Sequence, residues 1–120
     1  MNHAPPATTI NLPDALALGP PPDGNLAVPV FSHGTLEVEL YAPSGVDPQQ
    51  PHDRDEAYVV ARGTATFVDD GTRSSVEPGA FIFVAAGRPH RFESMSADFA
   101  VWVLFYGPVG GEGESAGLPR

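Results

Sequence analysis

The sequence predicts an all-β domain, either a two-sheet sandwich or a small barrel of the jelly-roll kind. Three observations support this prediction. Short runs of alternating apolar and polar residues recur about every 8–12 residues, as strands of such folds do. Turn residues separate the runs, and the chain holds 13 glycines and 14 prolines. No apolar pattern of helical period is long enough to compete with these strands.

An irregular arm is expected over residues 1–24, where prolines leave room for only one short helical turn near 14–18. The β domain then occupies residues 25–107. A flexible tail is expected over 108–120, because this segment is dominated by residues that bury little surface. The chain is thus one domain with an extension at each end.

The strands follow in order from the alternation of apolar and polar residues. In the second strand, Glu37 and Glu39 occupy the polar positions. We therefore expect both carboxylates on an exposed face, and not as a catalytic pair. Asp-Gly at 70–71 marks a tight hairpin between two later strands. The expected strands are 26–31, 35–41, 56–62, 64–68, 73–76, 81–84, 90–93 and 99–106.

The last strand, 99–106, is apolar at both parities. A strand of this kind is normally covered on both faces. We expect the core to cover one face and the arm or a second subunit to cover the other. A homodimer is therefore expected.

Composition excludes several kinds of chemistry. The chain of 120 residues has a formal net charge of -9 and contains neither lysine nor cysteine. Schiff-base lysines, P-loop lysines, thiol nucleophiles and disulfides are therefore excluded. The acidic balance, without a basic cluster, argues against a nucleic-acid partner. There is no signal-peptide pattern and no run of ~20 apolar residues, so we expect a cytoplasmic protein with no membrane partner.

Two histidines and a glutamate are candidate ligands for one metal ion. His52, Glu56 and His90 supply a two-histidine-one-carboxylate set, which leaves coordination positions open for water or substrate. Four residues of straight strand would hold His52 and Glu56 ~13 Å apart, so the chain must turn between them. Gln50, two residues before His52, would share its face on an incoming strand and offer an amide oxygen as a fourth donor. If Gln50 points away, three donors remain.

The residues around these donors resemble the two motifs of the cupin family. Gln50 stands in place of the first histidine of the first motif. Ala85 and Ser94 stand in place of the proline and asparagine of the second motif. The matching residues are His52, Glu56 and Gly63 in the first motif and Gly79, Gly87 and His90 in the second.

The resemblance extends over roughly residues 35–106 and implies the cupin fold, a double-stranded β-helix or jelly-roll barrel. It implies no single activity, because cupins include dioxygenases, isomerases, epimerases, decarboxylases, storage proteins and sugar-sensing domains. The donor set suits one divalent transition metal ion. Fe(II), Mn(II), Ni(II) and Zn(II) all fit it, and the sequence does not favour one of them over the others. The alternative is a relic pocket that keeps the motif without binding an ion.

Residues near the ligands are candidates for the substrate pocket. Tyr58 and Phe92 follow two of the ligands by two residues, so parity directs both side chains into the same interior. Tyr58 is also the candidate acid or hydrogen-bond donor of catalysis, whereas Phe92 has the alternative of being a plain core residue. Arg54 and Arg91 are candidates for binding a substrate carboxylate or phosphate, with solvated charge as the alternative.

Three functions remain open at the level of the sequence. The first is a small metalloenzyme acting on a small polar metabolite, such as a sugar or keto acid, by isomerase- or dioxygenase-type chemistry. The second is a module that binds or senses a small-molecule ligand in the same pocket without turnover. The third is a structural dimer module with a decayed site. Metal content separates the third function from the first two, and turnover separates those two from each other.

Overall fold

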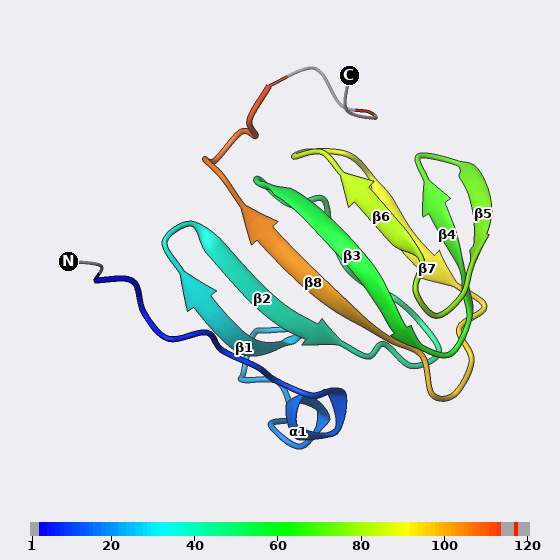
Figure 1. Cartoon of the computed structure of the whole chain (residues 1–120). Helices are drawn as coiled ribbons and strands as arrows, with labels where there is room; N and C mark the ends of the chain where they lie inside the picture. The colour runs from blue at the N-terminus through cyan, green and yellow to red at the C-terminus, as the bar shows by residue number, and fades with distance from the viewer. Residues whose placement is uncertain (1–2, 114–116, 118–120) are drawn as a thin grey trace.

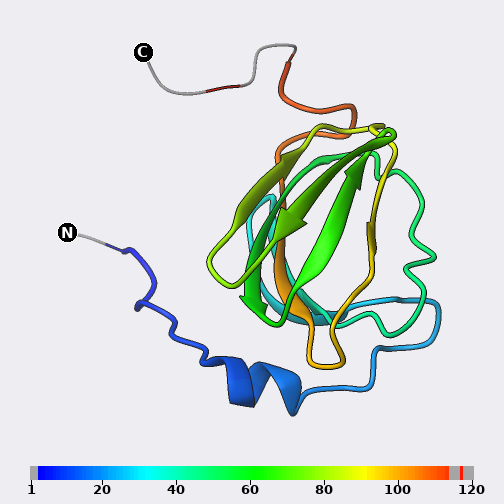
Figure 2. The same ribbon diagram turned by 90° about the vertical axis from the view of Figure 1, so that its right-hand side faces the viewer.

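The computed structural model describes residues 3–113 and residue 117, and these form two antiparallel sheets that face each other (Figures 1 and 2). A short helix, α1 (Leu12–Leu16), precedes the strands. The larger sheet has five strands in the order β1-β2-β8-β3-β6, and the smaller has three in the order β5-β4-β7. The strands are β1 (Val28–His33), β2 (Leu36–Tyr41), β3 (Asp55–Arg62), β4 (Ala65–Asp69), β5 (Thr72–Val76), β6 (Phe81–Val84), β7 (His90–Glu93) and β8 (Ala100–Tyr106).

This architecture confirms the all-β prediction. Every expected strand is present and lies within two residues of its expected bounds, and the helical turn expected near 14–18 is α1. The Asp-Gly hairpin joins β4 to β5, with positive φ at both Asp70 (45°) and Gly71 (97°). Positive φ at both central residues is the conformation that an antiparallel two-residue hairpin requires.

The core lies between the two sheets. Along β3, Tyr58 and Val60 point inward and are 1% and 2% exposed, while Val59 between them faces outward. The ring of Phe92, from the smaller sheet, packs edge-on against Tyr58 and Phe67 at centroid distances of 5.1 and 5.3 Å. These rings join the sheets, because Tyr58 belongs to the larger sheet and the two phenylalanines to the smaller.

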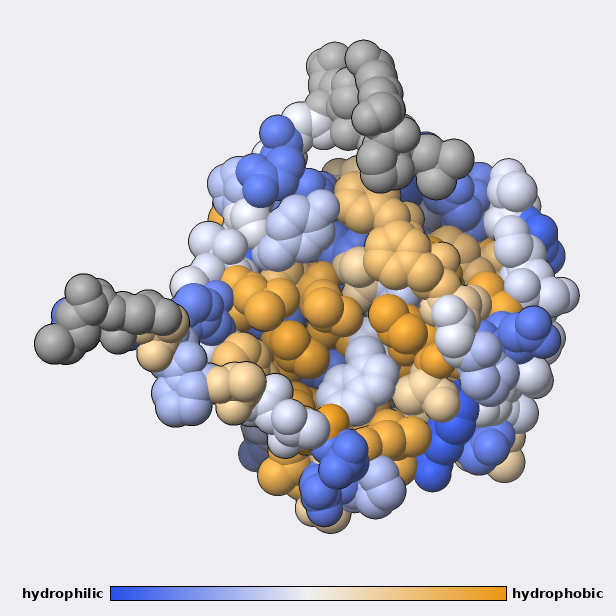
Figure 3. Space-filling model, viewed as in Figure 1, coloured by the Kyte–Doolittle hydropathy of each residue, from blue (hydrophilic) through white to orange (hydrophobic). Residues whose placement is uncertain are grey.

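The outer face of the five-stranded sheet is also apolar, and the arm covers part of it. Helix α1 packs Ala15 against Leu40 of β2 and Trp102 of β8, so the core and the arm together cover β8 on both faces, as expected. Figure 3 shows apolar side chains gathered over the middle of this outer face. Phe81 and Phe83 of β6 lie on the same face and remain 69% and 37% exposed.

Apolar and polar residues alternate along β2 as expected, but the polar positions face the inside of the molecule and the apolar positions face the arm. Leu40 pairs with Trp102 and packs under α1 on the outer face, whereas Glu39 pairs with the core residue Val103 on the inner face. The expectation that both glutamates face solvent is therefore wrong for Glu39, which lines an internal pocket. The physical reason is that the arm gives the apolar residues of β2 an alternative surface to pack against.

The segment after β8 turns back over the loops beside it. The amide of Gly110 donates to the carbonyl oxygen of Asp53 at 2.6 Å, and the amide of Glu112 donates to the Asp55 carboxylate at 2.8 Å. Residues 114–116 and 118–120 of the predicted tail, and residues 1–2 of the arm, lie outside the described residues. In the part of the chain that the structure describes, no helix is both long enough and apolar enough to span a membrane.

The turn after β3 generates a test of packing. Gly63 has a φ of 75°, and a Cβ added there would lie 2.7 Å from the Cα of Phe99. We expect Gly63→Ala to lower the free energy of unfolding by roughly 2–4 kcal/mol, from left-handed backbone and steric overlap together. Gly79→Ala is the control, since its φ is 90° but nothing lies within 4 Å of the added Cβ. Gly79→Ala should lower the free energy of unfolding by ~1–2 kcal/mol in a denaturant titration. Equal losses for the two variants would contradict the predicted steric overlap at Gly63.

Candidate metal centre

His52, Glu56 and His90 each bring one potential ligand atom within 4.8 Å of the other two. Glu56 Oε1 lies 2.9 Å from His90 Nε2 and 3.8 Å from His52 Nε2. Donors bound about 2.0–2.3 Å from one ion lie at roughly such separations from each other. The three side chains that the sequence predicts as ligands are therefore close enough to share an ion.

Each ligand comes from a different part of the fold. Glu56 is on the inner face of β3, and His90 opens β7 in the opposite sheet. His52 precedes β3 in a loop that bends at residues 53–54, so the chain turns between the first two ligands as their spacing requires. The carbonyl oxygen of His52 accepts a hydrogen bond from Gly87 N–H at 2.7 Å. This bond joins the loop of the first motif to that of the second.

A backbone carbonyl fixes the orientation of the His90 ring. His90 Nδ1 lies 2.8 Å from the carbonyl oxygen of Arg88, which can only accept, so Nδ1 carries the hydrogen. The neutral ring therefore presents the lone pair of Nε2 to Glu56. Such a partner on the far nitrogen is what a metal-binding histidine normally has.

Glu56 is the buried group that most needs a positively charged partner. It is 1% exposed, and among the described residues neither of its carboxylate oxygens has a hydrogen-bond donor. A carboxylate oxygen and a ring lone pair 2.9 Å apart repel each other unless a proton or a metal ion lies between them. The donor set therefore fits a cation.

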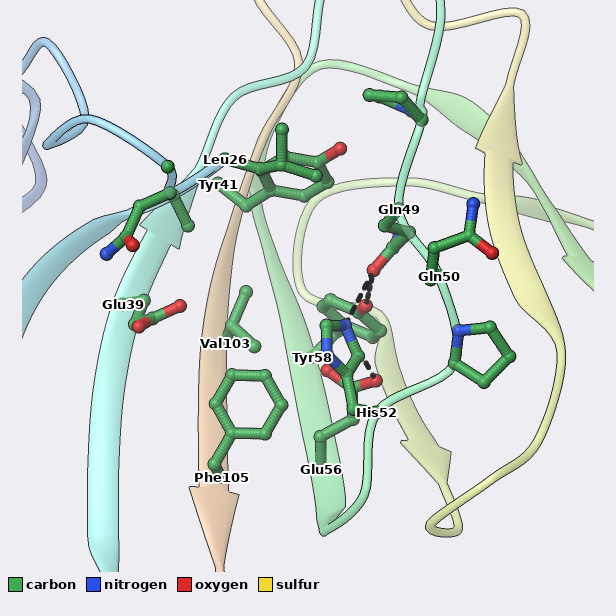
Figure 4. A pocket seen from close by; sticks show the side chains of 15 residues that line it. Leu26, Glu39, Tyr41, Gln49, Gln50, His52, Glu56, Tyr58, Val103 and Phe105 are labelled. Atoms are coloured by element: carbon green, nitrogen blue, oxygen red, sulfur yellow. Dashed lines mark hydrogen bonds and ion pairs between the residues drawn. The ribbon is translucent and has the colours of Figure 1, made fainter.

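The side-chain oxygen of Gln49 is a further hydrogen-bond acceptor beside the candidate ligands. Its amide nitrogen donates to the carboxylate of Asp47 at 2.6 Å, which turns the amide oxygen toward the ligands. Gln49 Oε1 lies 3.1 Å from His52 Nε2 and accepts a hydrogen bond from the Tyr58 hydroxyl at 2.9 Å (Figure 4). Sequence reasoning missed both Asp47 and Gln49, although Gln49 directly precedes the glutamine that it selected.

The expectation for Gln50 needs correction. Gln50 is exposed at the rim of the pocket, and its side chain points away from His52 in Figure 4. The sequence prediction placed Gln50 beside His52 by assuming the two-residue period of a strand. The segment between β2 and β3, which holds both residues, is a loop and not a strand. The amide oxygen that approaches the ligands belongs to Gln49.

Tyr58 lies where the sequence placed it, in the pocket beside the ligands. Its hydroxyl is 3.0 Å from His90 Nε2 and donates to Gln49 Oε1. Burial raises the pKa of Tyr58 well above its usual value, and the negative charge of Glu56 raises it further. The hydroxyl therefore keeps its proton at neutral pH.

Three other predicted pocket residues lie elsewhere. Phe92 is 1% exposed and belongs to the aromatic core. Arg54 donates to the carbonyl oxygens of Gly107 and Thr35 and to a β2 glutamate, outside the pocket wall. Arg91 is exposed and pairs with Glu93 at 2.7 Å. Phe92 is thus a core residue, and both arginines have acceptors within the protein, which are the alternatives that the sequence left open.

A pocket of about 440 Å³ opens beside the ligands (Figure 4). Its wall is made by residues 24–27, the inner faces of β2, β8 and β3, and the loop residues 48–52. His52 reaches into it with its ring 5.0 Å from that of Phe105. A volume of this size holds a small organic molecule.

A family model described as the cupin domain matches residues 37–106, which is more than half of the chain. The chain belongs to the cupin family. The two sheets are those of a cupin, and the matched region contains Glu39, His52, Glu56, Tyr58 and His90.

Individual proteins resemble this cupin to different extents. The uncharacterized protein SCO3923 of Streptomyces coelicolor is 36% identical over 75 residues, which are 61% of this chain and 71% of that protein. A cupin-2 domain containing protein from Shewanella frigidimarina has a TM-score of 0.63 at 17% identity, covering 79% of this chain and 91% of that one. At this identity the similarity shows the fold alone.

Two further solved structures are longer than this cupin. The EutQ protein of Clostridium difficile matches with a TM-score of 0.57 and 20% identity, over 67% of this chain and 60% of that one. The DMSP lyase DddQ of Ruegeria pomeroyi matches with a TM-score of 0.52 and 28% identity, over 61% of this chain and 39% of that one. This cupin therefore spans less than two thirds of each.

Opposing effects set the pKa of His90. Burial favours the neutral ring, but the Glu56 carboxylate and the Arg88 carbonyl oxygen outweigh it and raise the pKa above the ordinary 6.5. In the metal-free protein, the raised pKa of His90 stabilises the fold. This contribution is fully present at pH values below the pKa of His90 in the unfolded chain, and it is lost as the pH rises through the pKa of His90 in the folded protein. Metal binding has the opposite pH dependence, because Nε2 must give up its proton to bind an ion.

We therefore expect opposite trends between about pH 8 and about pH 6. Acidification should strengthen the contribution of the His90–Glu56 pair in the metal-free protein and weaken metal binding. Melting temperatures recorded against pH, in EDTA and with added Zn(II) or Mn(II), check both trends. His90→Gln should abolish the acid-side contribution in EDTA. A metal-dependent rise in melting temperature that is the same at both ends of the range would contradict the assignment.

Proposed function

We propose that this cupin is a metal-dependent enzyme that acts on a small polar metabolite, by isomerase- or dioxygenase-type chemistry. The observation that carries the proposal is the buried carboxylate of Glu56, whose oxygens have no hydrogen-bond donor among the described residues and face two imidazoles. Such a set of acceptors, fixed before an ion arrives, is typical of a metal site.

The ligands and their neighbours divide the chemistry between them. A divalent ion held by His52, Glu56 and His90 would polarise a substrate oxygen or activate dioxygen. Tyr58 would donate a hydrogen bond to a substrate oxygen, since its hydroxyl faces the pocket and its raised pKa keeps it protonated. Gln49 would hold that hydroxyl in place, because its own amide is fixed by Asp47.

Similarity to an enzyme supports catalysis at this site. DddQ is a lyase by its name, and it is 28% identical over 61% of this chain. The small volume of the pocket and the polar groups that converge at one end of it are also typical of a site for a small metabolite.

A non-catalytic binding or sensor module is the second candidate. One observation favours it, since the Tyr58 hydroxyl is already engaged by Gln49 and His90 and must leave at least one of them to reach a substrate. In that case the same metal and pocket would bind a ligand without turnover.

Metal content tests the shared part of both candidates. We expect protein purified without an affinity tag to carry about one transition metal ion per chain by elemental analysis. His52→Ala, Glu56→Gln and His90→Ala should each lower metal affinity by more than the roughly 10–100-fold that loss of an outer partner costs. His33→Ala is the control, because His33 is exposed at the end of β1. A chain that stays empty with Fe(II), Mn(II), Ni(II) and Zn(II) would exclude both candidates.

Turnover then separates the enzyme from the binding module. Metal-loaded protein that converts a member of a metabolite panel, and loses this activity in Tyr58→Phe with metal content unchanged, supports the enzyme. Metal-dependent rises in melting temperature without product, in air and under nitrogen, support the binding module.

We also propose that a second copy of the chain covers the outer face of the five-stranded sheet. The chain carries a charge of -9, so two copies can approach closely only where charges are sparse. The outward positions of β6 are Phe81 and Phe83, and those of the adjoining β3 include Ala57 and Val59. This strip is free of charge and lies beyond the area that α1 covers.

Light scattering after size-exclusion chromatography tests the dimer. We expect a dimer for the wild type and a monomer for the double variant Phe81→Ser, Phe83→Ser, because both rings leave the interface. Val109→Ser is the control, since Val109 is 73% exposed but does not lie on β6. A monomeric wild type at tens of micromolar would contradict the proposal.

A further inference from the structure

Glu39 is a pocket carboxylate that the metal centre does not use. It lies at the opposite side of the pocket from Glu56 and Tyr58, on the inner face of β2 (Figure 4). Among residues 3–113 and 117, no side chain or backbone group forms a hydrogen bond or ion pair with its carboxylate. A half-buried carboxylate of this kind is available to a ligand.

The sheet sets the separation between Glu39 and Tyr58, which lies beside the ligands. Glu39 pairs with Val103, and Val103 pairs with Tyr58, so two inter-strand steps separate the glutamate from the tyrosine. At about 4.8 Å a step, the backbones of these two residues are about 10 Å apart. The side chains between the two ends are Val103 and Phe105, so the middle of the pocket floor is apolar.

The pocket is electrostatically suited to a cation at the Glu39 end. Of the described residues that line it, none is an arginine, and its charged members are Glu39 and Glu56. Burial raises the pKa of Glu39, and the nearby charges of Glu37 and Glu56 raise it further. A positively charged group beside Glu39 would relieve both effects.

We propose that the pocket binds a small zwitterion, with an oxygen donor at the metal and an ammonium-type group at Glu39. This inference rests on the proposed metal site and narrows its substrate class. It also departs from the expectation that arginines hold an anionic substrate, because Arg54 and Arg91 lie outside the pocket wall and are paired within the protein.

The length of the ligand follows from the spacing. The side chains at both ends extend into the pocket, so the ~10 Å between their strands sets the scale of the span. A metal–oxygen bond takes about 2 Å of it and an ammonium–carboxylate contact takes about 3 Å. About 5 Å remains, which is the length of a short aliphatic chain. The apolar floor formed by Val103 and Phe105 suits such a chain.

Three probes of equal length test the proposal by calorimetric titration of the metal-loaded protein. They are 4-aminobutanoate, pentanoate and glutarate, which end in an ammonium, a methyl and a second carboxylate group. We expect 4-aminobutanoate to bind at least about 10-fold tighter than the other two. In Glu39→Gln this preference should fall to within about threefold, with metal content unchanged. Glu37→Gln is the matched control and should keep the preference, because Glu37 is paired with Arg54 outside the pocket.

A fourth probe separates failure of this inference from failure of the metal site. Butylamine lacks the carboxylate, so we expect it to bind weakly, to require Glu39 and to be indifferent to EDTA. Glu39-dependent binding of butylamine by a chain that takes up none of Fe(II), Mn(II), Ni(II) and Zn(II) when they are offered would retain the cation site and refute the metal site. Equal binding of the three metal-dependent probes, no binding of any of them, or an unchanged preference in Glu39→Gln would overturn the zwitterion proposal.

Discussion

The buried carboxylate of Asp47 is the constraint on which the site depends. It is 7% exposed and accepts hydrogen bonds from the Tyr41 hydroxyl, the Phe92 amide, and both the backbone and side-chain amides of Gln49. These donors belong to one strand from each sheet and to the loop between β2 and β3. A single charge, with four donors and little water, therefore holds that loop against both sheets. Without it, Gln49 would lose the contact that directs its amide oxygen toward Tyr58 and His52.

The centre itself combines rigid and loop-borne ligands. Glu56 and His90 are almost completely buried on strands of opposite sheets, so their separation is set by the packing of the sheets. His52 is 34% exposed and is held through its carbonyl oxygen by Gly87. The carboxylate of Asp55 binds the amides of Ala86 and Glu112, which ties the neighbouring loops to the start of β3. Acceptors are thus concentrated at the candidate metal centre, while the backbone amides around it donate to other groups, such as the Asp55 carboxylate.

The sequence predicts the strands and the cluster of His52, Glu56 and His90 well, because both depend on short-range rules. Alternation and turn residues locate each strand, and imidazole and carboxylate groups at motif spacing locate the ligands. Gln50 and Glu39 could not be placed in this way. The first lies outside any strand, where residue parity has no meaning. The second faces inward while the apolar residues of β2 pack against the arm on the outer face, and this tertiary contact leaves no mark in the local pattern.

The distribution of donors between strands and loop has a kinetic consequence. Both His52 and Gln49 belong to the loop before β3, so lifting that one segment removes two donors together while Glu56 and His90 stay in place. In the proposed metal-bound protein, ion exchange would be coupled to loop opening, and the residence time of the ion would depend on how long the loop stays closed. A small molecule that binds in the pocket and stabilises the closed loop would slow dissociation of the ion without contacting the ion.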